Sequence, residues 1–170
     1  MIEKGLNETD VIVLLLDKEI RNALKQDQIR DDKTLDGMDI TLCAIHHNTN
    51  KIYFTCAQTT LYLLRKGEIE MFKGDKYPVG GAQAEVKTFS VTEVQLEEGD
   101  RIYMYSDGIV DQFGGPQRRK FTPKRLQQMI IDLQPIPVSE QTAPITEVFD
   151  EWKGRVEQID DMTLMGFQIT

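Results

Sequence analysis

Two short acidic motifs carry the residue types best suited to chemistry in this chain of 170 residues. They are Tyr105-Ser106-Asp107-Gly108 and Asp160-Asp161-Met162-Thr163. Each motif adjoins a β-type run, so a rigid sheet can hold its carboxylates in fixed positions. Carboxylates without nearby His or Cys favour hard, oxygen-preferring cations such as Mg²⁺ or Mn²⁺. Such an ion lowers the pKa of bound water and neutralises phosphate, which is the chemistry of phosphoester hydrolysis.

Each motif also has a plainer interpretation. Asp-Gly after a strand is usually a turn, and Asp-Asp before a strand is usually a solvated acidic turn. Taken singly and on composition alone, this plainer interpretation is favoured for Asp107 and for Asp160.

Composition and charge restrict the class of protein. The formal net charge of −8 argues against a general nucleic-acid binder, because neutralising phosphates needs a basic surface. The longest apolar run, Val11 to Leu16, is too short to cross a bilayer, and the N-terminus lacks the pattern of a signal peptide. We therefore expect a cytoplasmic protein without direct membrane contact.

The cysteines do not form a metal-binding or disulfide pattern. Cys43 and Cys56 are too few for a secreted disulfide framework, so we expect reduced core thiols. If a hairpin turns at Thr49-Asn50, the two cysteines face each other across it.

The length of 170 residues predicts a single domain over residues 1–170, and hydrophobic spacing predicts helices and short strands along it. A helix is expected over Asp10–Gln26, where Val11, Leu14, Leu15, Ile20, Ala23 and Leu24 fall at largely helical spacing. A solvated loop follows to Gly37. The chain then turns to short β-type runs, at Ile40–His46, Lys51–Ala57, Leu61–Arg65, Ile69–Lys73, Val86–Leu96 and Arg101–Ser106. Helices are expected at Pro123–Leu133 and between Ser139 and Lys153, and a last strand at Met162–Ile169.

The motifs, taken in order, resemble the SpoIIE-type branch of the metal-dependent type 2C serine/threonine phosphatases along nearly the whole chain. The resemblance rests on Asp36-Gly37-Met38-Asp39-Ile40-Thr41-Leu42, Leu61-Tyr62-Leu63-Leu64, Gly74-Asp75-Lys76 with Pro78-Val79-Gly80, Leu96-Glu97-Glu98-Gly99-Asp100, Tyr105-Ser106-Asp107-Gly108, Asp111-Gln112-Phe113-Gly114-Gly115, Glu151-Trp152-Lys153-Gly154 and Asp160-Asp161-Met162-Thr163-Leu164. It implies an α+β fold, an α-β-β-α sandwich of antiparallel sheets flanked by helices.

The resemblance also implies roles for individual residues. Asp107 and Asp160 would be catalytic ligands of the paired Mg²⁺ or Mn²⁺ ions that hold the attacking water in the complete domain. Asp161 would orient these ligands, and Gly108 belongs to the same motif. Asp36 and Asp39 would contribute to a weaker metal site, although a plain loop position is favoured for both.

One family motif has no counterpart in this chain. The first metal motif of the family, a strand-end Asp-Gly, lies upstream of the first helix, and nothing in residues 1–35 replaces it. We therefore expect an N-terminally truncated domain that binds fewer ions. Open sheet edges and apolar faces then favour a homo-oligomer.

The function implied is hydrolysis of phosphoserine or phosphothreonine on a regulatory protein that resembles an anti-sigma-factor antagonist, under an upstream sensor domain. The alternative is a non-catalytic module that keeps the fold for binding or oligomerisation. A basic cluster from Arg118 to Arg125 could guide an acidic or phosphorylated protein, although a solvated loop and helix start is favoured. His46 and His47 are expected at the surface and Trp152 in helix packing.

Overall fold

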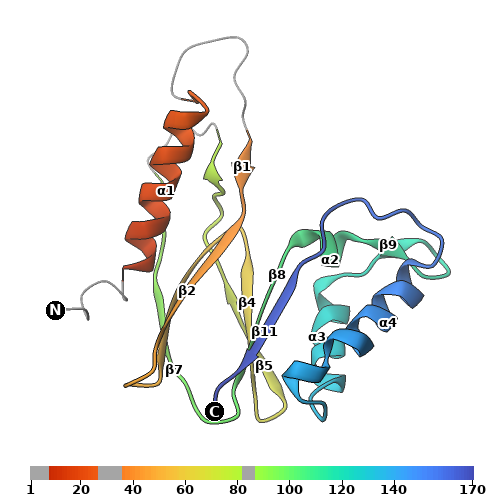
Figure 1. The fold of residues 1–170 in the computed structure, drawn as a ribbon. Coiled ribbons are helices and arrows are strands. Elements are labelled where there is room, and N and C mark those ends of the chain that lie inside the picture. Colours follow the sequence, from red (N-terminus) through yellow and green to blue (C-terminus); the bar gives the residue numbers. More distant parts are fainter. Residues whose placement is uncertain (1–7, 27–35, 82–86) are drawn as a thin grey trace. The chain divides into compact units, whose positions relative to one another are not determined.

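The computed structural model describes residues 8–26, 36–81 and 87–170 (Figure 1). The chain forms two compact units, Met1–Thr60 with Lys73–Glu97, and Leu61–Phe72 with Glu98–Thr170. Both contain helices and antiparallel strands, so the predicted α+β class is confirmed. In the part of the chain that the structure describes, no helix is long and apolar enough to cross a membrane.

The first unit joins one helix to a small antiparallel sheet. The sheet has the strand order β2-β3-β7, and a second ladder pairs β1 with β6. The elements are α1 (Thr9–Ala23), β1 (Gly37–Met38), β2 (Ile40–His46), β3 (Lys51–Ala57), β6 (Val79–Gly80) and β7 (Thr92–Gln95). Their core is formed by Val13, Ala57, Val79 and Phe89.

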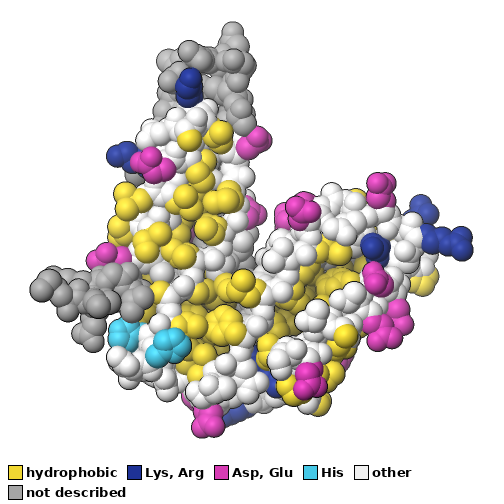
Figure 2. Space-filling view, in the orientation of Figure 1, with side chains coloured by type: hydrophobic (Ala, Val, Ile, Leu, Met, Phe, Trp, Pro, Cys, Tyr) yellow, Lys and Arg dark blue, Asp and Glu magenta, His cyan; other side chains and the backbone are white. Residues whose placement is uncertain are grey.

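The helix α1 is confirmed, but its buried face differs from the one its apolar spacing indicates. Thr9, Val13 and Asp17 are buried, whereas the apolar side chains Val11, Ile12, Leu14, Leu15 and Leu24 are exposed. Polar contacts explain the choice of face, since the Thr9 hydroxyl lies 2.9 Å from that of Thr55 and Asp17 pairs with a buried lysine. Figure 2 shows the resulting run of hydrophobic side chains over α1.

The hairpin of β2 and β3 has a different register from the predicted one. Thr41 faces Cys56 and Cys43 faces Phe54, so the two cysteines are diagonal neighbours rather than a facing pair. The reason is a longer turn over residues 47–50, in which Asn50 has a φ of 51°. Both cysteines are thiols, as predicted.

The strand predicted over Val86–Leu96 is shorter than expected. Residues 87–91 are not in a strand, and only Thr92–Gln95 pairs with β3. Side chains hold this segment in place of a ladder: Lys87 binds Asp17, and the backbone N–H of Ser90 donates to Asp75 Oδ2 at 2.6 Å. Val86 and the predicted loop over 27–35 lie outside the described residues.

The second unit is a four-stranded antiparallel sheet with helices packed on it (Figure 1). The strand order is β11-β8-β4-β5, and β9 and β10 form a separate ladder. The elements are β4 (Thr60–Arg65), β5 (Glu68–Lys73), β8 (Arg101–Tyr105), α2 (Asp107–Asp111), β9 (Phe113–Gly114), β10 (Arg119–Lys120), α3 (Pro123–Asp132), η1 (Val138–Glu140), α4 (Thr142–Lys153) and β11 (Leu164–Gln168).

The predicted helical faces of this unit are confirmed. Leu126, Met129, Ile130 and Leu133 are buried, and they share one core with Tyr62, Tyr103, Phe121 and Phe149. Arg65 fixes the sheet by donating from Nε and Nη2 to the two carboxylate oxygens of Asp100, at 2.9 and 2.5 Å. A bidentate pair of this kind is directional, so β4 is held in register with the start of β8.

Candidate functional site

The two acidic motifs lie at the same end of the sheet in the second unit. The strands β8 and β11 are antiparallel neighbours, and Tyr105, the last residue of β8, faces Leu164, the first residue of β11. The end of one strand is therefore beside the start of the other. This topology places the segment containing Asp107 next to the segment containing Asp160 and Asp161.

Ser106 joins these two segments directly. Its backbone N–H donates to the Thr163 carbonyl at 2.9 Å, and its hydroxyl donates to the Asp161 carbonyl at 2.8 Å. The hydroxyl also accepts from the Thr163 N–H at 2.9 Å. Sequence reasoning gave Ser106 no role, although its position between β8 and Asp107 was the available indication.

Gly108 allows the two segments to approach closely. A Cβ at this position would lie 2.4 Å from the Asp161 carbonyl oxygen and 3.3 Å from the Asp160 Cβ. The first distance is shorter than any non-bonded contact a side chain tolerates. The glycine of the Asp-Gly motif is thus required by packing against the second acidic motif.

The carboxylates of Asp107, Asp160 and Asp161 are all exposed. Asp160 Oδ1 accepts from the Asp161 backbone N–H at 2.7 Å, and the Asp160 carbonyl accepts from Gln158 Nε2 at 2.8 Å. Within the described residues, the Asp107 carboxylate has neither an ion pair nor a hydrogen bond. Its oxygens are available to a ligand from outside the chain.

The donor chemistry of this site suits a hard divalent cation in part. Asp107 and Asp160 supply carboxylate oxygens, which Mg²⁺ and Mn²⁺ prefer, but Mg²⁺ takes an octahedral set of ligands. Across residues 8–26, 36–81 and 87–170, no group of at least three His, Cys, Asp or Glu side chains is arranged to hold a metal ion. The two aspartates are therefore a partial ligand set that water or a phosphate must complete.

The other predicted site residues lie in the first unit. Asp36 and Asp39 are exposed beside β1, and the Asp36 carbonyl accepts from Gln26 Nε2 at 2.8 Å. Their part in a weaker metal site stays a prediction. His47 is exposed, and His46 Nδ1 lies 3.2 Å from the Thr49 hydroxyl at the hairpin turn.

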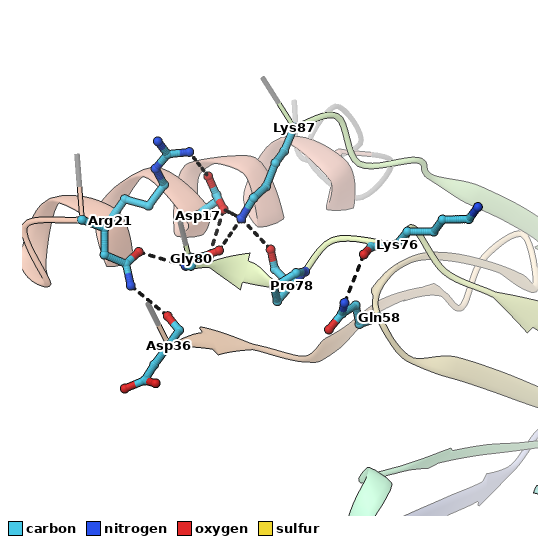
Figure 3. A network of polar contacts seen from close by, with 10 residues as sticks. Asp17, Arg21, Asp36, Gln58, Lys76, Pro78, Gly80 and Lys87 are labelled. Atoms are coloured by element: carbon cyan, nitrogen blue, oxygen red, sulfur yellow. Dashed lines mark hydrogen bonds and ion pairs between the residues drawn. The ribbon is translucent and has the colours of Figure 1, made fainter. Parts of the chain in front are cut away.

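A buried ion pair in the first unit is of a different kind (Figure 3). Lys87 Nζ donates to Asp17 Oδ1 and to the Pro78 carbonyl, each at 2.8 Å, and also to the Gly80 carbonyl. Asp17 Oδ1 in addition accepts from the Gly80 N–H at 2.8 Å. The two charges satisfy each other and the backbone of β6, so they bind α1 to this strand.

The comparisons with known proteins agree with this topology. The family profile of stage II sporulation protein E (SpoIIE) matches residues 2–170. The SiaA-PP2C domain of Pseudomonas aeruginosa is similar, with 25% identity and a TM-score of 0.85 over 98% of this chain. This chain spans 63% of the length of that one. No match was found among curated proteins.

More distant structures share the fold. The phosphatase domain of the cell fate determinant SpoIIE from Bacillus subtilis has 16% identity and a TM-score of 0.61, over 99% of this chain and 75% of that one. The catalytic domain of the serine threonine protein phosphatase PstP, in complex with 2 manganese ions, has 16% identity and a TM-score of 0.67. That match covers 99% of this chain and 73% of the PstP chain. The fold is thus that of PP2C phosphatases.

Proposed function

The chain belongs to the SpoIIE family, and from this premise we propose that it is the metal-dependent phosphatase output domain of a bacterial signalling protein. The proposed reaction is hydrolysis of phosphoserine or phosphothreonine on a regulatory protein. The observation that carries the proposal is the pairing of β8 with β11, which brings Asp107 and Asp160 to one end of one sheet.

Each residue of the site has a defined task in this proposal. Asp107 and Asp160 would hold Mn²⁺ or Mg²⁺, and such an ion supplies Lewis acidity and a water of lowered pKa when bound. Ser106 fixes the spacing of the two aspartates through its hydrogen bonds to the second acidic segment. Asp161 orients Asp160 by donating its backbone N–H to Oδ1. Gly108 leaves room for that segment.

The partners follow from the same family premise and stay proposals. A phosphorylated regulatory protein resembling an anti-sigma-factor antagonist would be the substrate, and an upstream sensor domain would control the site. Self-association is supported by two features of the first unit. β2 is an edge strand without Pro, and α1 exposes Val11, Ile12, Leu14 and Leu15.

Hydrolysis of a generic aryl phosphate with and without Mn²⁺ tests the proposal. We expect turnover that requires Mn²⁺ and that Asp107→Asn abolishes. Glu147→Gln is the matched control, because Glu147 is an exposed carboxylate of α4 in the same unit. Turnover that persists in Asp107→Asn would contradict the assignment of this residue.

The alternative function is a non-catalytic phosphatase-like module for binding or oligomerisation. The specific observation in its favour is the partial ligand set at Asp107 and Asp160, since the described residues hold no group of three metal-binding side chains. A folded protein that binds Mn²⁺ but gives no turnover would support this alternative.

A further inference from the structure

A basic and aromatic surface lies around Trp152, at the end of α4 in the second unit. One hollow of about 420 Å³ is lined by Pro116, Arg118, Trp152, Lys153, Arg155 and Val156 among others. A second hollow of about 250 Å³ is lined by Gly114, Pro116, Arg119, Arg125 and Trp152 among others. Both include Trp152, Gly115 and Pro116, so they adjoin each other, and we name them together the Trp152 surface.

The indole of Trp152 is held in a fixed position. Its Nε1 donates to the Gln112 carbonyl at 3.1 Å, and Phe121 meets its ring edge-on at a centroid distance of 5.6 Å. The backbone N–H of Gly115 donates to the Trp152 carbonyl at 2.7 Å. A Cβ at Gly114 would lie 2.0 Å from the same carbonyl oxygen, so the glycine permits this contact.

Arg125 is prepositioned on this indole. Its guanidinium carbon lies 4.3 Å from the ring centroid, within the range of a cation–π contact. Stacking occupies the face of the guanidinium and leaves the N–H donors at its edge available. A stacked arginine therefore binds a carboxylate or phosphate with little further loss of side-chain freedom.

The charge of this surface is opposite to that of the chain as a whole. The net charge of the chain is −8, whereas the charged residues that line the two hollows are Arg118, Arg119, Arg125, Lys153 and Arg155 with one acidic residue, Glu151. Lys120 pairs with Asp111 at 2.9 Å and Lys153 with Asp150 at 3.7 Å. Within the described residues, Arg118, Arg119 and Arg155 have no ion pair. Figure 2 shows Lys and Arg side chains, with Asp and Glu side chains beside them, at the end of this unit where α4 and β9 lie in Figure 1.

Short connections link the Trp152 surface to the acidic site. Asp107 begins α2, and Gln112 directly follows this helix and accepts the Trp152 N–H. The buried Gln112 side chain donates to the Glu157 carbonyl at 3.1 Å, shortly before Asp160. Since α2 has 5 residues, it spans about 7.5 Å at about 1.5 Å per residue. A few residues of extended peptide cover the length of this helix, which lies between Asp107 and the residue that binds the Trp152 N–H.

We propose that the Trp152 surface binds an acidic segment of the phosphoprotein substrate, a few residues from the phosphorylated side chain. This inference rests on the proposed phosphatase function and names its recognition site. Arg118, Arg119 and Arg125 bind the carboxylates, and Trp152 with Pro116 and Val156 packs against the apolar part of the segment. Glu151, which also lines the larger hollow, disfavours an acidic group next to itself. A long nucleic acid is disfavoured by the charge of −8 on the whole chain.

Fluorescence of Trp152 measures binding directly, because it is the only tryptophan of the chain. The first probe is a phosphoserine peptide with Asp and Glu on one side of the phosphoserine, and the second has Asn and Gln at the same positions. We expect the acidic peptide to bind at least tenfold more tightly than the neutral peptide, as measured by the change in Trp152 emission. The affinity for the acidic peptide should fall as NaCl is added.

Two variants locate the effect. Arg118→Glu with Arg119→Glu removes the preference for the acidic peptide, while the emission of the unbound protein and its unfolding midpoint stay those of the wild type. Lys18→Glu is the matched control, because Lys18 is an exposed cation of α1 in the other unit, and it keeps the preference. Equal affinity for both peptides, or an unchanged preference in the double variant, would overturn the inference.

Two further arms separate this inference from the phosphatase proposal and from a nucleic-acid site. Asp107→Asn is expected to keep the preference for the acidic over the neutral peptide whether or not the wild type turns over an aryl phosphate. Absence of aryl phosphate turnover by the wild type, with a retained preference for the acidic peptide, would thus count against the phosphatase proposal alone. A single-stranded oligonucleotide of equal charge that binds more tightly than the acidic peptide would overturn the inference.

Discussion

The buried pair of Asp17 with Lys87 and the exposed aspartates Asp107 and Asp160 differ in what their carboxylates do. Lys87 and Asp17 lie in the interior of the first unit, where each hydrogen bond of the ammonium goes to the protein itself. Asp107 and Asp160 are exposed in the second unit, where the Asp107 carboxylate faces solvent and Asp160 Oδ1 accepts the backbone N–H of Asp161. The first arrangement stabilises the fold, and the second is suited to a ligand.

The largest expected effect comes from breaking the buried pair. Lys87→Met removes the buried counter-ion of Asp17 and leaves it the partly exposed Arg21, so we expect the free energy of unfolding to fall by about 3–5 kcal/mol. Urea denaturation followed by circular dichroism measures the change. Arg21→Gln is the control, because Arg21 lies 3.9 Å from Asp17 and is partly exposed, and its loss should cost less than about 1 kcal/mol. A stable Lys87→Met protein would contradict the structural role of the pair.

The next effect tests how tightly the two acidic segments pack. Gly108→Ala forces a methyl group against the Asp161 carbonyl, so we expect the free energy of unfolding to fall by about 1–3 kcal/mol. We also expect the variant to lose any metal-dependent turnover. Comparison with Gly99→Ala separates the steric clash at Gly108 from the cost of backbone strain. Gly99 has a φ of 87° and no neighbouring atom within 4 Å, so its alanine variant carries the backbone cost alone. Retained activity in Gly108→Ala would show that the approach of the two segments is unimportant.

Neutralising one carboxylate in each unit compares the structural role of the buried Asp17 with that of the exposed Asp107. Asp17→Asn leaves the Lys87 ammonium buried without a counter-ion and should destabilise strongly, whereas Asp107→Asn should change the stability by no more than about 0.5 kcal/mol. Thermal unfolding of the two variants in parallel measures both. Equal losses at the two positions would mean that Asp107 has a structural role.

The smallest effect concerns the reactivity of a thiol in the first unit. Burial, with a contribution from Cys56, raises the pKa of Cys43 to about 12. At pH 8 the thiolate fraction is then about 10⁻⁴, and we expect alkylation by iodoacetamide to be slow and to accelerate as the pH rises. Mass spectrometry of tryptic peptides over a pH series follows the reaction. Rapid modification of Cys43 at pH 7 would contradict its raised pKa and its partial burial in β2.

The sequence predicted a helix and its buried face correctly where the helical spacing of apolar residues decided which side packs. Pro123 and the spacing of Leu126, Met129 and Ile130 predicted α3 and its buried face, because apolar side chains form that face and the hydrogen bonds of Gln127 leave it in place. In α1 the same reasoning identified the helix, and Ile20 of the predicted apolar face packs against the core, but Val11, Leu14 and Leu15 are exposed. The buried contacts of Thr9 and Asp17 with residues distant in sequence outweighed the apolar spacing, and no local pattern contains those contacts.

The candidate site shows the same limit. Its two acidic motifs were identified, because each stands at the edge of a β-type run. The contacts that join them were not, since the hydrogen bonds of Ser106 and the close approach of Gly108 depend on the pairing of β8 with β11. Likewise, the stacking of Arg125 on Trp152 joins two helices whose contact cannot be read from either alone.

Binding of Mn²⁺, measured by electron paramagnetic resonance, tests most directly the claim that Asp107 and Asp160 act together as metal ligands. Changes to residues that only orient metal ligands cost about 10–100-fold in affinity, so loss of a ligand should cost at least as much. We predict that Asp107→Asn and Asp160→Asn each weaken Mn²⁺ binding about tenfold or more, while Glu147→Gln binds as the wild type does. Unchanged Mn²⁺ affinity in either aspartate variant would contradict the claim.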